Sequence, residues 1–433
     1  MAKKSSFKTM VAALVSGVKK YLFIYLFLSL IFLGHYFIAG QAVYGDGIDY
    51  WSYLHTWYFD KNTDFTNEYK HLYRPEFNNA HPEAFSSVIQ KTKITEKGFT
   101  DNIHPPGTSI FMFPFYVLAH FINSLLNMWG LGWLNNGYSD IYQVTVGLGI
   151  VFYMTLATYL TKRLVRKLTG NENISWLSAL AILTASPLLY YGGYDVINSH
   201  FASYLITVTF WLMFFTADLN KRKWQIILGL IVGLATLVRV QDILLAVPLI
   251  WRLRDKPYAI LGSGLVGFLV IMPQMWDWYR LYGTPWPQTY VTAGIYPDFL
   301  GSIFNPLTGL VRTPIVILAL SVMFWIRKPW MNYFLSFLIP TYILISLQGG
   351  WSASAYGGRM YISNLPFVAV LLSLLLSKIK PQLTKAIILI FFIINVLSIG
   401  SFVLLEKEVN SGKRRGLEEH TIIKLQQRFP FLK

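Results

Sequence analysis

Long apolar runs that are nearly free of charge recur along the chain, at lengths close to that of a membrane-spanning helix. About 20 apolar residues in a helix cross the hydrocarbon core of a bilayer. Nine such runs extend over 21–39, 141–160, 174–191, 200–217, 258–274, 309–326, 330–347, 361–377 and 386–405. No small-residue cleavage site follows the first run, so we expect it to stay as the first helix. The pattern predicts an all-α polytopic membrane protein.

Two shorter apolar runs, 224–238 and 243–251, are separated by the polar residues Arg239, Gln241 and Asp242. They form either one long helix or two short helices that meet at this break. Read as two helices, they leave all the strongly basic loops between spans on one side of the membrane, which the positive-inside rule assigns to the cytosol. Read as one helix, they disturb this alternation. We therefore expect two helices and, in total, about eleven spans.

The segment 108–128 is also apolar enough to cross, but a crossing there would place the basic residues 162–167 outside. We expect it to lie on the outer surface as a juxtamembrane or re-entrant helix. The sequence then divides into an integral membrane domain (1–405), with an outer loop (40–140) inserted after the first helix, and a short basic C-terminal tail (406–433). The N-terminus faces the cytosol, and the tail is expected outside, against anionic headgroups.

Composition agrees with a membrane protein, since 54% of the 433 residues are hydrophobic and only 13% are charged. Soluble domains carry about a quarter charged residues. The absence of cysteine excludes disulfides, thiolate metal sites and cysteine nucleophiles. The formal net charge of +16 is explained by retention of positive charge on the inner face, so it does not indicate nucleic-acid binding.

Polar side chains capable of chemistry gather in the loops assigned to the outer face. Charged groups at the ends of spans or in breaks between half-helices are costly unless they are paired or solvated, so they are candidates for a site. Arginine forks bind phosphate, and a carboxylate can accept a proton. The candidates are Asp46, Asp49, His104, Asp195, His200, Arg239, Asp242, Gln274, Asp277, Gln348, Arg359 and Tyr361.

Several motifs are better explained by helix packing than by ligand binding. Residues 262–267 fit G-x-G-x-x-G, but they lie inside a span with no strand before them, so we interpret them as small-residue packing, as we do Gly229 and Gly233. No P-loop, HExxH or GxSxG motif occurs.

Several outer-face motifs together resemble those of GT-C glycosyltransferases, which use polyprenyl-phosphate sugars. The chain is similar in this respect to lipid A aminoarabinose transferase and to protein O-mannosyltransferases. The motifs are Gly45-Asp46-Gly47-Ile48-Asp49-Tyr50-Trp51, His104-Pro105-Pro106-Gly107, Tyr194-Asp195 with His200, Val238-Arg239 and Gly357-Gly358-Arg359-Met360-Tyr361. The chain departs from the family where an acid and a lysine are replaced by His104 and Pro105, and where an Asp-Glu pair becomes Asp-x-x-Asp.

The resemblance implies a GT-C-like bundle and an inverting transfer from a polyprenyl-phosphate sugar donor to an acceptor hydroxyl on a lipid, a glycan or a protein. The expected setting is the plasma (inner) membrane, with the site facing the periplasm or the cell exterior. Asp46 is the expected general base, with Asp49 as an orienting residue or metal ligand. Other roles are as follows: donor phosphate binding by Arg359, Arg239 and His104; substrate binding by Tyr50, Gln241, Trp351 and Tyr361; and a divalent metal such as Mg²⁺ or Mn²⁺ at Asp195 and His200. The polyprenyl tail requires an apolar groove, for which 224–251 and 361–377 are candidates.

Each of these roles has a structural alternative. Asp46 and Asp49 could only cap the exit of the first helix, His104 could only begin the juxtamembrane helix, and Asp195 could only cap a turn. The arginines could reach toward headgroups. At the level of function, the alternatives are a transporter or flippase for a lipid-linked sugar and an O-antigen polymerase or ligase. The absence of an inverted repeat argues against the transporter, and the early position of the long loop argues against the polymerase.

Overall fold

The computed structural model describes residues 7–72, 94–286, 295–352 and 356–404, and this part of the chain is helical. Its extended pairing is limited to two isolated bridges, Ile94 with Thr100 and Ile295 with Gln348. The all-α prediction is confirmed. The predicted tail (406–433) lies outside the described residues.

The α-helices are α1 (Phe7–Ala39), α2 (Asp46–His55), α3 (Thr66–Leu72), α5 (Gly107–Asn127), α6 (Asp140–Thr169), α7 (Glu172–Ala185), α8 (Pro187–Leu189), α9 (His200–Thr216), α10 (Arg222–Val238), α11 (Ala246–Leu253), α12 (Pro257–Tyr282), α14 (Gly301–Phe304), α15 (Pro314–Ser321), α16 (Met331–Leu347), α17 (Leu365–Leu376) and α18 (Pro381–Leu404). Short π or 3-10 turns are η1 (Thr56–Asp60), η2 (Tyr190–Tyr194), η3 (Val240–Leu245), η4 (Leu310–Arg312), η5 (Val322–Phe324), η6 (Gly349–Ser352) and η7 (Arg359–Asn364).

All eleven apolar runs that were predicted to span the membrane fall on helices of the structure. Six helices in the described part are long and apolar enough to cross a bilayer, or seven if α7 and the turn that follows it, bent by 71°, form one span. Helix α5 is among the six, whereas the positions of the basic residues predict that it lies on the surface. The protein is therefore a multi-pass membrane protein, and the number of eleven spans remains a prediction.

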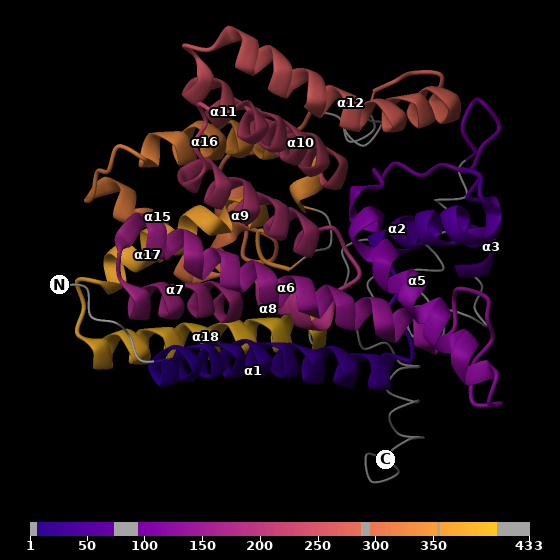
Figure 1. Ribbon diagram of the computed structural model, residues 1–433, viewed down its shortest axis with the longest axis horizontal. Coiled ribbons are helices and arrows are strands. Elements are labelled where there is room, and N and C mark those ends of the chain that lie inside the picture. Colours follow the sequence, from indigo (N-terminus) through magenta and orange to yellow (C-terminus); the bar gives the residue numbers. More distant parts are fainter. Residues whose placement is uncertain (1–6, 73–93, 287–294, 353–355, 405–433) are drawn as a thin grey trace.

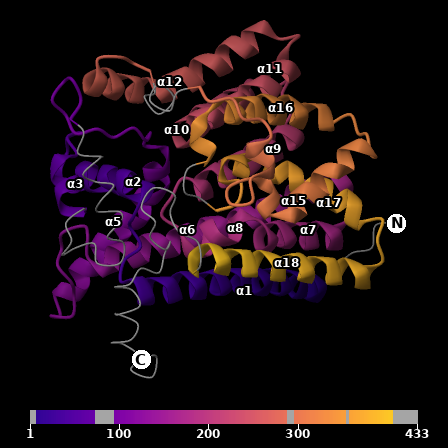
Figure 2. The same cartoon turned by 180° about the vertical axis from the view of Figure 1, so that it is seen from behind.

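The helices form an elongated bundle in which α6 is central, in contact with α1, α5, α7, α9 and α17. Helices α2, α3 and α5, which belong to the long loop after α1, gather at one end of this bundle (Figures 1 and 2). The start of α6 and the end of α1 lie at the same end. The loop thus forms a cap at one end of the bundle, where the polar residues of the candidate site also lie.

The predicted break after α10 is present. Helix α10 ends at Val238, and Arg239 adopts an extended conformation (φ −148°, ψ 119°) before a short 3-10 turn leads into α11. Extended backbone cannot continue the i to i−4 hydrogen bonds of a helix. The polar residues 239–242 therefore lie between two helices rather than in the middle of one, as expected.

Helices α10 and α12 cross at glycines, which confirms the packing interpretation of these motifs. A Cβ atom on Gly229 would overlap the carbonyl oxygen of Ser263, and one on Gly233 would lie 2.7 Å from the carbonyl oxygen of Gly267. Small residues at such a crossing allow two backbones to approach closely in a membrane. Within the G-x-G-x-x-G sequence of α12, Ser263 and Gly267 thus lie in the helix interface, whereas a Cβ on Gly262 or Gly264 would meet no atom within 4 Å.

We expect Gly229→Val to lower the free energy of unfolding by about 1–3 kcal/mol, because the added side chain overpacks the α10–α12 crossing. The midpoint of thermal unfolding in detergent measures this change. Gly262→Val, in the same helix pair, is the control, since a Cβ on Gly262 meets no atom within 4 Å. Equal midpoints for the two variants would contradict the proposed role of the crossing.

Candidate active site

Helix α2 carries two acidic residues in its first turn, Asp46 and Asp49. Between them, Gly47 allows the helix to approach the turn before α9, because a Cβ on Gly47 would lie only 2.5 Å from the carbonyl oxygen of Ile197. A residue with a side chain would force α2 away from this turn. The Gly-Asp-Gly sequence therefore seats the two acids directly against the bundle.

Asp46 and Arg359 form an ion pair across 313 residues of sequence, with 3.4 Å between Asp46 Oδ2 and Arg359 Nη1. The Asp46 side chain is 44% exposed, whereas that of Arg359 is 19% exposed. The buried Nε of Arg359 has no hydrogen-bond partner among the described residues. The pair therefore presents an accessible carboxylate beside a guanidinium with a donor still to be satisfied.

Asp49 lies deeper, with only 2% of its side chain exposed. Its Oδ1 accepts a hydrogen bond of 2.6 Å from the hydroxyl of Tyr69, and its Oδ2 lies 2.6 Å from Nδ1 of His104. The amide of Asn102 donates to the Asp49 carbonyl oxygen at 3.2 Å. Both carboxylate oxygens of Asp49 are thus engaged in holding the loop against α2.

His104 lies between the two acids. Its Nε2 is 3.9 Å from Asp46 Oδ2, while Nδ1 contacts Asp49. The ring of Tyr50 meets the imidazole edge-on, with 5.2 Å between ring centroids. Burial raises the pKa of Tyr50, and the neighbouring Asp46 adds to the effect, so this phenol stays protonated as a hydrogen-bond donor.

The break after α10 is tied to the segment that carries Arg359. Arg239 Nη1 donates to the Arg359 carbonyl oxygen at 3.2 Å, and Arg239 Nη2 lies 2.7 Å from the sulfur of Met360. The amide of Gln241 donates to the Met360 carbonyl oxygen at 2.9 Å. The start of α5 also packs here, because Gly107 fits closely against Leu237. Two arginines and two acids from distant parts of the sequence therefore lie in one region.

The two remaining aromatic candidates are placed by α14. The hydroxyl of Tyr361 donates to Ser302 at 2.9 Å, and Trp351 packs closely against Gly301. Both aromatic side chains are buried. Trp351 lies in η6, and Tyr361 lies in η7, the turn that begins with Arg359, whereas Tyr50 lies in α2.

The predicted metal site at Asp195 and His200 gains no third His, Asp or Glu ligand among the described residues. Among the described residues, a group of three His, Asp or Glu side chains close enough to hold an ion is found elsewhere, at His55, Asp60 and Glu68. His200 Nδ1 lies 3.2 Å from the guanidinium of Arg239. A positive group at this distance disfavours a cation on the same nitrogen, so a metal at Asp195 and His200 stays a prediction.

Sequence reasoning missed two residues that hold the site together, Tyr69 and Asn102. Asn102 could have been identified from the sequence, because Asn side chains often accept a hydrogen bond from the backbone two residues later, in an Asx turn. Here Oδ1 of Asn102 accepts from the His104 N–H at 3.2 Å. Tyr69 could not have been identified from the sequence, since its contact with Asp49 depends on how α3 folds back onto α2. Both side chains are fully buried.

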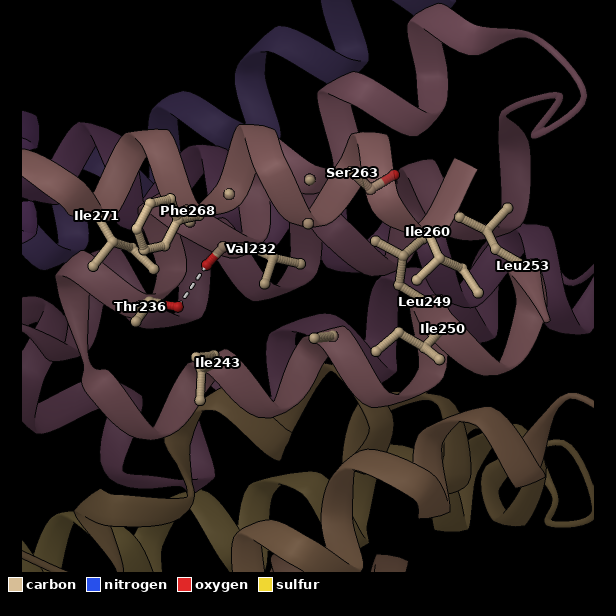
Figure 3. Close-up of a pocket in the computed structure, with 15 residues that line it drawn as sticks. Val232, Thr236, Ile243, Leu249, Ile250, Leu253, Ile260, Ser263, Phe268 and Ile271 are labelled. Carbon is tan, nitrogen blue, oxygen red and sulfur yellow. Dashed lines mark hydrogen bonds between the residues drawn. The ribbon is translucent and has the colours of Figure 1, made fainter. Parts of the chain in front are cut away.

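An apolar groove of about 250 Å³ runs along the bundle beside this region. Its walls come from α10, the η3–α11 segment and α12. In Figure 3, Thr236, Ile243 and Ile271 lie toward one end, and Leu253 and Ile260 toward the other. Thr236 precedes Arg239 by one helical turn, so one end of the groove lies near the break after α10. Residues of 224–251 and of α12 line this groove, and none of its lining residues belongs to 361–377; its use by a polyprenyl tail stays a prediction.

Residues 132–277, from just before α6 to α12, match the family model of dolichyl-phosphate-mannose-protein mannosyltransferases. No curated protein and no solved structure matches the chain significantly. The matched segment includes Arg239, Gln241 and all the residues that line the groove, while Asp46 and Arg359 lie before and after it. This segment, about a third of the chain, is thus similar to a domain of the dolichyl-phosphate-mannose-protein mannosyltransferases, which are membrane glycosyltransferases of the GT-C type.

Proposed function

We propose that the protein transfers a sugar from a polyprenyl-phosphate donor to an acceptor hydroxyl on the outer face of the membrane, with inversion at the anomeric carbon and Asp46 as the general base. The observation that carries this proposal is the Asp46–Arg359 ion pair, since it joins a proton acceptor to a phosphate-binding group in one region. The apolar groove, whose Thr236 end lies one helical turn before Arg239, suits the lipid tail of the donor.

Exposure favours Asp46 over Asp49 as the base. A general base must come within hydrogen-bond reach of the acceptor hydroxyl. Asp46 is 44% exposed, whereas Asp49 is nearly buried and engaged by Tyr69 and His104. We therefore assign Asp49 an orienting role, in which it holds His104 at the edge of the site.

The reaction is a single displacement. The acceptor oxygen forms a bond to the anomeric carbon while the bond from that carbon to the donor phosphate oxygen breaks. The acceptor proton moves to Asp46, and polyprenyl phosphate leaves with the electron pair. Charge grows on the phosphate in the transition state, so fixed positive groups there lower the barrier. Arg359 is the main candidate for this contact, with Arg239 holding its backbone and His104 beside it.

The ion pair also suggests how binding could activate the base. A guanidinium binds phosphate with paired hydrogen bonds, so the arriving donor competes with Asp46 for Arg359. Once Arg359 contacts phosphate, the Asp46 carboxylate is released toward the acceptor. The base would then become available only when the donor is in place.

The topology of eleven spans, with α5 on the outer surface, is part of this proposal, and α5 packs on α6. Tyr153 of α6 stacks near Phe201 at the start of α9 and also meets Phe111 near the start of α5. Farther along α5, His120 bonds to Tyr142 at the start of α6. Helix α5 thus packs along the first half of α6.

Filling the groove should weaken binding of donors with long lipid tails. Gly264 lines the groove, and a Cβ there meets no atom within 4 Å, so Gly264→Phe should place its ring in the groove. We expect about tenfold weaker apparent affinity for a long-chain donor, comparable to losing the burial of about two methylene groups. The KM for long and short polyprenyl donors measures the effect, which should be small for the short donor.

Gly262→Phe is the matched control, because Gly262 has equally open surroundings but does not line the groove. If the two variants raise the KM for the long donor equally, the groove is not the tail site.

The proposed function is tested with purified protein, polyprenyl-phosphate mannose or another polyprenyl-phosphate hexose or pentose, and panels of lipid, glycan and peptide acceptors. We expect a glycosylated product with inverted anomeric configuration and one equivalent of polyprenyl phosphate. Movement of the intact donor across reconstituted vesicles without bond cleavage would instead favour the flippase. A product formed only from polyprenyl-diphosphate oligosaccharides would favour the polymerase or ligase.

A further inference from the structure

We propose that His55, Asp60 and Glu68 form a site for one divalent transition-metal ion, Zn²⁺ or Mn²⁺, which clamps the end of α2 to α3. His55 is the last residue of α2, Asp60 ends η1, and Glu68 lies in α3. The site is separate from the ion pair, since Asp46 and His55 lie at opposite ends of α2, about 13 Å apart at 1.5 Å per helical residue.

The three side chains converge at distances that suit a shared ion. His55 Nδ1 lies 2.9 Å from Glu68 Oε1 and 3.5 Å from Asp60 Oδ2, and one ligand atom from each residue lies within 4.8 Å of the others. Bonds of about 2.0–2.2 Å to a tetrahedral Zn²⁺ place ligand atoms about 3.4 Å apart. The arrangement therefore needs only small side-chain movements to bind an ion.

Glu68 supplies a second, independent observation. Its side chain is fully buried, and its Oε2 has no hydrogen-bond partner among the described residues. An unsatisfied oxygen on a buried carboxylate is costly, and burial raises the pKa of Glu68. A cation between Glu68, Asp60 and His55 would satisfy this oxygen and neutralise the two acids.

Surrounding contacts hold the ligands in position, as is usual around metal ions. Thr56 Oγ1 donates to Glu68 Oε1 at 2.7 Å, and the Asn67 amide donates to Asp60 Oδ2 at 2.7 Å. The imidazole of His55 is stacked against Tyr138 at 4.4 Å between centroids. An imidazole nitrogen with two carboxylates favours Zn²⁺ or Mn²⁺ over Ca²⁺ and Mg²⁺, which take mainly oxygen ligands.

The proposed metal site is linked to Asp49 of α2 through Tyr69. Tyr69, the residue after Glu68, donates its hydroxyl to Asp49. An ion that fixes Glu68 to the end of α2 would therefore also fix Tyr69 against the start of α2. The role of this metal is structural, and it holds Asp49 in position through α3.

The test uses full-length protein purified in detergent without chelator. We expect about one Zn²⁺ or Mn²⁺ per chain by elemental mass spectrometry, a lower unfolding midpoint after chelation, and recovery on adding Zn²⁺ or Mn²⁺ but not Mg²⁺. Glu68→Gln should abolish binding. Thr56→Val keeps all three ligands but removes the hydrogen bond to Glu68, so it should weaken metal affinity by about 10–100-fold. This second variant tests the proposal if Glu68→Gln fails to fold.

Asp64→Asn is the matched control, because Asp64 lies in the same loop, four residues from both Asp60 and Glu68, and bonds to Thr66 instead. It should retain the wild-type metal content. Metal-free wild-type protein whose unfolding midpoint does not respond to either ion would overturn the proposal and indicate that Asp60 and Glu68 share a proton. Unchanged metal content in Glu68→Gln would also overturn it.

Discussion

Asp46→Asn is expected to lower kcat by about 10²–10⁴-fold, the usual contribution of a general base. The amide cannot accept the acceptor proton, although it keeps the size of the carboxylate. Donor affinity should stay the same or increase, because Arg359 loses its carboxylate partner and remains available to phosphate. Initial rates over a range of acceptor concentrations give kcat, and binding of a non-hydrolysable donor analogue gives the affinity.

Two other carboxylates provide comparisons. Asp49→Asn should reduce activity through the position of His104, and His104→Gln should reproduce most of that loss, since the two side chains contact each other at 2.6 Å. Asp64→Asn, in the same loop, should have wild-type activity. An Asp46→Asn enzyme with a normal rate would show that the base is another group, with His104 the next candidate.

The helices were predictable because the bilayer makes apolar length a direct signal. All eleven runs coincide with helices, and the break at Arg239 was identified because basic residues in neighbouring loops constrain topology. The glycines at 229 and 233 were interpreted as packing residues for the same reason: in a uniformly apolar helix, small size is the informative property. How many of these helices cross the membrane depends on their depth, which apolar length alone does not determine.

The candidate site was predictable in its residue types but not in its pairings. Asp46 and Arg359 could be selected as charged groups at span ends, yet their contact depends on the packing of η7 against α9. The pairing of Asp49 with His104 and Tyr69 was not visible, because it arises from loop segments that fold back onto α2. The cluster around Glu68 was missed for a similar reason, since its three residues follow no metal-binding spacing.

Arg359→Ala is expected to weaken donor binding by about 1.5–3 kcal/mol, the range for hydrogen bonds to charged groups, or about ten- to a hundredfold in Kd. Arg359→Lys keeps the charge but not the planar fork, so it should recover only part of this loss. Binding is best measured in the Asp46→Asn background, because turnover does not consume the donor there. The ion pair is already absent in this background, so the change in affinity reports only the loss of the arginine. Arg280→Ala is the control, because Arg280 bonds to the Thr63 carbonyl oxygen at 2.9 Å.

Comparison of the two backgrounds also tests whether Arg359 exchanges Asp46 for phosphate. If the exchange occurs, Asp46→Asn alone should tighten donor binding, and this gain should disappear when Arg359 is also changed to Ala. The two substitutions would then be non-additive, as expected for groups that share a contact. Additive effects would mean that Arg359 binds phosphate without releasing Asp46, and an unchanged affinity in Arg359→Ala would mean that the arginine only anchors η7. The double-mutant cycle therefore separates phosphate binding from activation of the base, which the ion pair links in a single contact of 3.4 Å.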